Sequence, residues 1–134
     1  MAASRKPVAR NTVIANSIES AVSNLEAALE KANKAVTTRS AESKKLLNEL
    51  RRLRKRHAAQ MKRKQRAIAA EKKNSTADTR KTVRTTTSEL NATKKAIAKA
   101  TANRQAVLEE LAGLKASQKH VAAYVKGIYA ADRT

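Results

Sequence analysis

The spacing of the large apolar residues constrains the fold of this chain more than any other feature. From Ile18 onward, positions three and four residues apart form one series, most of whose first members are large and apolar. This spacing is typical of a coiled-coil seam on a long helix. The series is Ile18, Val22, Leu25, Leu29, Ala32, Val36, Arg39, Ser43, Leu46, Leu50, Leu53, His57, Gln60, Lys64 and Ala67. Polar residues interrupt it at Arg39 and Ser43, which leaves open a kink or a break near residues 37–40.

A second series with the same spacing follows in the second half of the chain. It runs through Val83, Thr87, Leu90, Lys94, Ile97, Thr101, Arg104, Leu108 and Leu111, shifts register near Val107, and continues through Leu114, Gln118, Val121, Val125 and Ile128. The chain has only two Gly and one Pro, so it offers few tight turns. The best turn candidate is the segment 72–78, where Ser75 and Asp78 have capping-box spacing. Thr86 and Glu89 offer a later helix start.

We therefore predict a helix over residues 12–72, a turn over 73–87 and a helix over 88–131, with residues 1–11 as a flexible basic arm. The apolar residues are densest in Ile14–Val36 and in Val107–Ile128. Folding the chain at about residue 74 brings these two ends together, so the expected fold is all-α, an elongated antiparallel helical hairpin or coiled coil, with 12–134 as one domain. Because two Ala-rich helices bury little surface, we also expect a homodimer through the same apolar ends.

The net charge of +19 is concentrated in the middle of the chain. Residues 51–84 hold 14 basic and 2 acidic side chains. The segment from Arg51 to Lys73 contains eleven Lys and Arg residues and a single acidic residue, Glu71. A solvated helix face usually alternates charge at i,i+4, because like charges at that spacing destabilise a helix. A field this strong favours a polyanionic partner.

The candidate nucleic-acid-binding residues are the cations of this region: Arg51, Arg52, Arg54, Lys55, Arg56, Lys62, Arg63, Lys64, Arg66, Lys72, Lys73, Arg80, Lys81 and Arg84. The Thr-rich segment 76–88 adds hydroxyls that could bind phosphate oxygens beside the cations. The alternative is that the segment is only a helix start with weak helix propensity. With no Phe or Trp, base stacking is not available there. The expected mode is contact with the phosphates of duplex DNA, with RNA as the alternative partner.

Catalytic and cofactor chemistry find no support in the residues. There is no Cys and no glycine-rich loop, and His57 and His120 lie on opposite sides of the predicted turn. Glu109 and Glu110 are adjacent, so they point to different helix faces. We expect no enzyme activity, no metal, no cofactor and no small-molecule substrate. The sequence contains no run of eighteen apolar residues, so we expect no membrane-spanning helix. The basic segment also lacks an aromatic residue that could anchor it to a membrane surface.

Three segments resemble a known family. MAASRKPV at residues 1–8, LEAALEKA at Leu25–Ala32 and LEELAGLKASQKHVAAYVKG at Leu108–Gly127 resemble the N-terminal helical region of the alginate regulatory protein AlgP family. That family is described as linker-histone-like, DNA-binding and transcription-regulating. Its members carry a tail of repeated Lys-Pro-Ala-Ala units, which this sequence lacks, so DNA binding would have to use the basic stretch 51–73 instead.

These observations predict a non-sequence-specific DNA-binding protein that is nucleoid-associated and modulates transcription in the bacterial cytoplasm. One alternative is an RNA- or ribosome-binding factor, since a basic rod suits ribosomal RNA equally well. The other is a coiled-coil adaptor whose apolar ends bind a protein partner, in which case the cations of the basic stretch would be dispensable.

Overall fold

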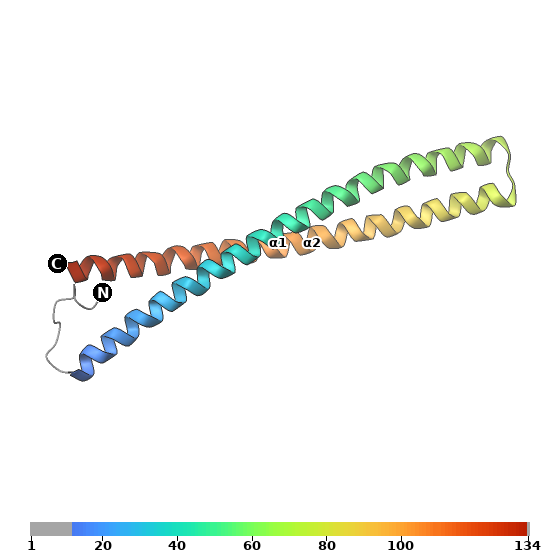
Figure 1. Ribbon diagram of the computed structural model, residues 1–134. Helices are drawn as coiled ribbons and strands as arrows, with labels where there is room; N and C mark the ends of the chain where they lie inside the picture. Colours follow the sequence, from blue (N-terminus) through green and yellow to red (C-terminus); the bar gives the residue numbers. More distant parts are fainter. Residues whose placement is uncertain (1–11, 134) are drawn as a thin grey trace. The chain divides into compact units, whose positions relative to one another are not determined.

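The computed structural model describes residues 12–133, and these fold into two long α-helices. Helix α1 spans Thr12–Lys73 and helix α2 spans Ala77–Arg133. The helices run antiparallel and pack against each other, and the described residues contain no strand. Figure 1 shows the chain reversing direction between them. The predicted all-α helical hairpin is confirmed. The predicted basic arm, residues 1–11, lies outside the described residues.

The seam of α1 follows its sequence pattern closely. All fifteen predicted seam positions from Ile18 to Ala67 are buried or half-buried. The helix continues without interruption through residues 37–40, so the alternative of a break there is wrong. Thr37 fits the helix because its hydroxyl donates a hydrogen bond to the Asn33 carbonyl at 3.0 Å, one turn earlier.

Helix α2 begins at Ala77, well before the predicted start at residue 88. Thr76 caps the helix: its Oγ1 accepts a hydrogen bond from the Thr79 amide at 3.2 Å. In return, Thr79 Oγ1 accepts from the Thr76 amide at 2.8 Å. This reciprocal pair is a capping box in which Thr takes the place usually held by Glu or Gln. The predicted pair Ser75 and Asp78 is one residue out of place, and Asp78 instead provides a negative charge in the first turn.

The predicted turn over 73–87 is too long because the Thr residues after Ala77 are compatible with a helix. The Thr82 hydroxyl donates to the Asp78 carbonyl at 3.0 Å, and the Thr86 hydroxyl donates to the Thr82 carbonyl at 2.9 Å. Each hydroxyl is thus satisfied within the preceding turn. Only Asn74, Ser75 and Thr76 remain between the two helices.

The seam of α2 differs from its prediction at several positions. Lys94 and Thr101, predicted in the seam, are exposed, whereas Thr93 and Ala100 are buried. A single three-four series therefore runs from Thr86 through the rest of the helix, and the predicted register shift near Val107 does not occur. The sequence reading favoured long side chains, but small residues such as Thr93 and Ala100 occupy the inner positions. The buried residues of α2 are Thr86, Leu90, Thr93, Ala100, Val107, Leu111 and Val125.

The chain divides into two compact units. Unit 1 comprises the described parts of Met1–Ser40 and Glu109–Thr134, and unit 2 is Ala41–Leu108. In unit 1, the Gln118 amide donates to Asn33 Oδ1 at 2.7 Å, and Arg39 pairs with Glu110 at 3.1 Å.

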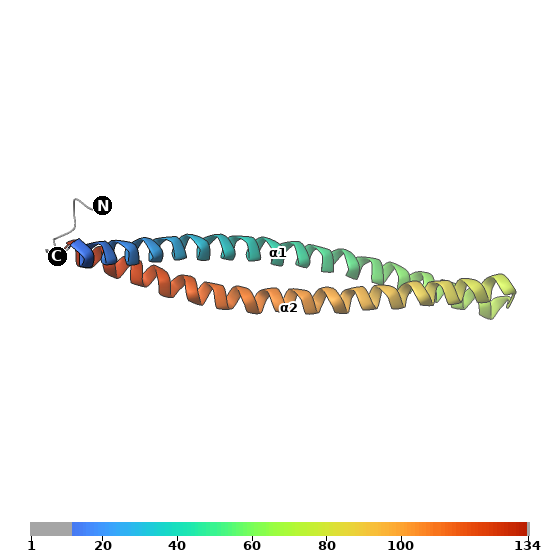
Figure 2. The same ribbon diagram turned by 90° about the horizontal axis from the view of Figure 1, so that it is seen from below.

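In unit 2, Arg63 approaches Glu89 at 4.0 Å, and the two helices lie side by side in both views (Figures 1 and 2). The residues of each of these three pairs lie nearly equally far from Ser75 in the sequence. This register is the one expected from folding the chain at about residue 74.

Candidate nucleic-acid interface

The charge of the chain is divided unequally between the two units. Unit 2 holds 20 basic and 5 acidic residues, a net charge of +15. The residues of unit 1 within 12–40 and 109–133 hold 7 basic and 6 acidic residues, a net charge of +1. Most of the net positive charge of the described residues therefore belongs to unit 2.

Nearly all the predicted cations of unit 2 face solvent. Thirteen of the fourteen candidate residues are exposed. The exception is Lys64, which is half-buried because it occupies a seam position between Gln60 and Ala67. An exposed cation remains hydrated and accessible, so it can exchange water and small ions for a phosphate group.

These cations are poorly neutralised by the protein itself. Within residues 12–133, only Arg63 among the fourteen forms an ion pair, and its 4.0 Å distance to Glu89 is long. Arg80 Nη1 donates a hydrogen bond to Ser75 Oγ at 3.2 Å, a neutral partner. Exposed ion pairs contribute little to stability, on the order of 0–1 kcal/mol. The contact with Glu89 therefore leaves Arg63 able to exchange this partner for another anion.

Helix α1 arranges its cations along its outer side. Arg51, Lys55, Lys62, Arg66 and Lys73 follow one another at spacings of four and seven residues, and all five are exposed. A neighbouring stripe consists of Arg52, Arg56 and Arg63, also exposed. Because the seam takes Leu53, Gln60 and Ala67, both stripes lie off the seam, and of their members Arg63 reaches α2, at Glu89. The exposure of both stripes agrees with the sequence pattern, and their role in binding nucleic acid stays a prediction.

The first turns of α2 add Arg80, Lys81 and Arg84, all exposed. The Thr hydroxyls beside these cations bond to atoms of the protein itself, rather than pointing freely toward a ligand as the phosphate-binding alternative would require. Those of Thr76, Thr79, Thr82 and Thr86 make hydrogen bonds within the turn and the helix. These four hydroxyls stabilise the turn and the start of α2.

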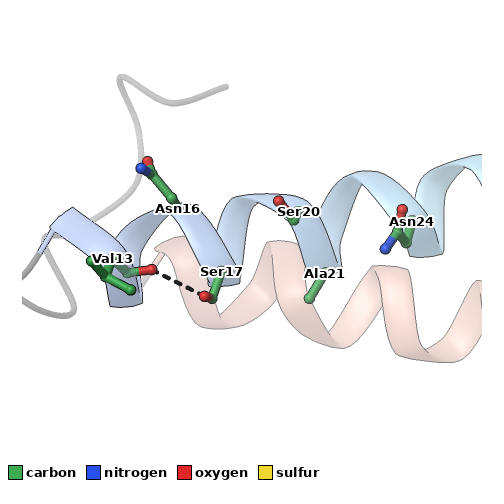
Figure 3. A pocket seen from close by; sticks show the side chains of 6 residues that line it. All are labelled: Val13, Asn16, Ser17, Ser20, Ala21 and Asn24. Carbon is green, nitrogen blue, oxygen red and sulfur yellow. Dashed lines mark hydrogen bonds between the residues drawn. The ribbon is translucent and has the colours of Figure 1, made fainter.

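A further surface feature of the described chain lies in unit 1. A shallow hollow on α1 in unit 1 is lined by Val13, Asn16, Ser17, Ser20, Ala21 and Asn24. Figure 3 shows that these side chains come from one helix and that Ser17 donates to the Val13 carbonyl at 3.0 Å. The hollow contains no charged group. No group of three potential metal ligands occurs among residues 12–133.

Two polar atoms in unit 2 were not anticipated from the sequence. Gln60 Oε1 and Arg104 Nε are buried, and neither has a hydrogen-bond partner among the described residues. Gln60 was predicted in the seam, but the pattern of spacing carries no information about how its amide is satisfied. The seam of unit 2 thus contains an unpaired polar atom within the basic stretch 51–73, at Gln60, and another outside it, at Arg104.

The chain matches no protein-family model, no curated protein and no solved structure at a significant level. The resemblance to the AlgP family therefore remains an expectation from the sequence. Neither described helix contains an apolar stretch long enough to cross a membrane. Arguments about function accordingly rest on the residues and geometry of the chain itself.

Proposed function

We propose that unit 2 binds duplex DNA through its phosphate backbone, without strong sequence preference. This proposal is supported mainly by thirteen exposed cations in a unit whose net charge is +15. Only one of these thirteen cations, Arg63, forms an ion pair among the described residues, and its distance of 4.0 Å is long. Arranging so many like charges on one surface costs free energy through self-repulsion, and a polyanion relieves this cost. On this proposal the protein is nucleoid-associated and modulates transcription in the bacterial cytoplasm.

The binding mode follows from the side chains that unit 2 offers. Lys and Arg contact phosphate oxygens and release the counterions condensed on the duplex, which supplies affinity that depends on salt. Base stacking is not available, because unit 2 contains no aromatic residue among Phe, Trp and Tyr. Phosphate contacts position a protein on DNA but carry no sequence information. The expected complex is therefore tolerant of sequence.

Unit 1 has a separate role in this proposal, as the place of self-association. Its seam includes large apolar residues that a single partner helix covers only in part: Ile18, Leu25, Leu29, Leu114, Val121 and Ile128 are half-buried. Its low net charge removes the repulsion that would oppose pairing of two copies. A homodimer through these apolar ends would carry two copies of the basic unit.

The proposal is tested by titrating the full chain against two duplexes of unrelated sequence from low to high salt. We expect equal affinity for both, and log affinity that falls linearly with log salt. Each phosphate contact contributes a slope of about −0.9, so six contacts would give roughly −5. A strong preference for one duplex, or affinity indifferent to salt, would contradict the proposal.

The variant R52A/R56A/R63A locates the binding surface. Ala is the best helix former, so the three substitutions preserve α1. We expect the salt slope to fall by about 2 to 3 if these residues contact phosphates. The matched control K115A/K119A/K126A removes the same charge from exposed positions of unit 1 and should leave the slope nearly unchanged. An RNA duplex, added at the same concentration as the DNA duplex, competes for the protein. If RNA displaces the DNA, the alternative partner, RNA, is favoured.

A further inference from the structure

Apart from Lys44 and Lys45, the basic residues of α1 within unit 2 form three clusters. The first is Arg51–Arg56, the second is Lys62–Arg66, and the third is Lys72 with Lys73. The segments between them, residues 57–61 and 67–71, contain no Lys or Arg. A helix face that needed charge only for solubility would have no reason to leave these gaps.

The clusters repeat at one spacing. Arg51, Lys62 and Lys73 follow each other at intervals of 11 residues, and the same interval relates Arg52 to Arg63 and Lys55 to Arg66. Eleven residues are close to three helical turns of about 3.6 residues each, so side chains related by this interval leave α1 in nearly the same direction. At a rise of about 1.5 Å per residue, successive repeats lie about 16.5 Å apart.

All seven of these side chains are exposed, and none is a seam residue. They belong to one uninterrupted helix within one compact unit, so their spacing is fixed by helix geometry. The first and last repeats, Arg51 and Lys73, are about 33 Å apart along α1. This is close to one turn of B-form DNA, which is about 34–36 Å.

A line drawn along a duplex parallel to its axis crosses the two strands in alternation, two crossings per turn, or about 17 Å apart on average. We propose that α1 lies along the duplex so that its three clusters contact three successive backbone crossings, spanning one helical turn. The outer clusters then meet one strand, and the second cluster meets the complementary strand. Long Arg and Lys side chains absorb the unequal widths of the two grooves.

The size of the hairpin favours this placement over insertion into a groove. Each helix with its side chains is about 10–12 Å across, while the major groove is about 12 Å wide and admits one helix. A pair of packed helices therefore spans the backbones. A single strand has no fixed crossings to match, so the preferred ligand is a duplex of at least one turn.

This inference rests on the proposed function, and a change of position without a change of composition tests it. The variant K62A/R63A/A69K/A70R moves two cations by one heptad. Ala69 and Ala70 are exposed, and they hold the same positions relative to the seam as Lys62 and Arg63. The two charges shift by about 10.5 Å along α1 and out of phase with the duplex, while net charge and residue content remain the same.

The full chain and this variant are titrated against a 16-base-pair duplex, with helix content measured by circular dichroism. We expect the variant to lose the phosphate contacts of Lys62 and Arg63, so that its salt slope falls by about 2. The affinity lost between 50 and 200 mM salt should then become about tenfold smaller. The unaltered chain should also bind the duplex more tightly than either of its single strands.

The outcomes separate the two proposals. If the unaltered chain shows no salt-dependent binding to the duplex, both are overturned. If it binds but the transposed variant has the same affinity and slope, then only the amount of charge matters, and the inference about spacing is wrong while the proposed function stands. A loss confined to the variant, with helix content preserved, supports both.

Discussion

Individual polar residues in the seam weaken unit 2. Gln60 is only 8% exposed, yet its Oε1 has no hydrogen-bond partner among the described residues. Ser43, Thr86 and Thr93 are also buried, each at a position that a coiled coil usually fills with an apolar side chain. An unsatisfied buried acceptor costs about 1–3 kcal/mol. Unit 2 therefore gives up stability at these seam positions.

The substitution Gln60→Leu should stabilise the protein. Leu has a similar volume and needs no hydrogen bond, so we expect the free energy of unfolding in urea to rise by about 1–2 kcal/mol. Gln65→Leu is the matched control, because Gln65 is exposed and should change stability by less than about 0.5 kcal/mol. Destabilisation by Gln60→Leu would mean that the amide is satisfied in solution.

At the scale of the elements, the sequence predicted α1 better than α2. In α1 most of the large apolar residues lie in the seam, and their spacing identifies every fully buried position through Ala67. In α2 the inner positions include Thr93 and Ala100, which a pattern of large side chains does not reveal. The start of α2 was missed for a related reason: Thr79 completes the cap with a hydroxyl where a longer acidic or amide side chain is usual.

The cap at Thr76 gives a prediction for this element. Thr76→Ala removes the acceptor of the Thr79 amide, and loss of such a cap typically costs about 1 kcal/mol. We expect a corresponding loss in the free energy of unfolding. Thr85→Ala, at an exposed position inside α2, is the control and should be neutral or slightly stabilising, because Ala has the higher helix propensity. Equal effects of the two changes would show that the capping box does not contribute.

At the scale of the whole molecule, the partition of charge decides how stability depends on salt. Unit 2 has a net charge of +15, so its own repulsion opposes folding. In unit 1, the ion pairs Lys34 with Glu30 and Arg39 with Glu110 join side chains that are exposed to solvent to a large part. The sequence revealed the concentration of charge in residues 51–84, but it could not show that this stretch lies inside one compact unit, Ala41–Leu108, because packing depends on contacts between distant residues.

Salt should therefore stabilise this protein. The screening length falls from about 30 Å at 0.01 M to about 10 Å at 0.1 M, which weakens repulsion between successive clusters. We expect the thermal midpoint, followed by helix content, to rise by several degrees over this range. The variant R52A/R56A/R63A should start from a higher midpoint at low salt and gain less from added salt, unlike K115A/K119A/K126A. A midpoint that falls with salt would show that attractive ion pairs dominate.

The three-residue turn between α1 and α2 also sets the order in which the chain assembles. Contacts near the turn, such as Arg63 with Glu89, join residues close in sequence, whereas Asn33 and Gln118 are 85 residues apart. Closing a long loop before a short one costs more chain entropy, so assembly proceeds from the turn outward. Unit 2 then forms the nucleus despite its internal repulsion. If a polyanion binds there as proposed, its presence lowers the barrier to that first step, and the ligand accelerates the folding of its own binding site.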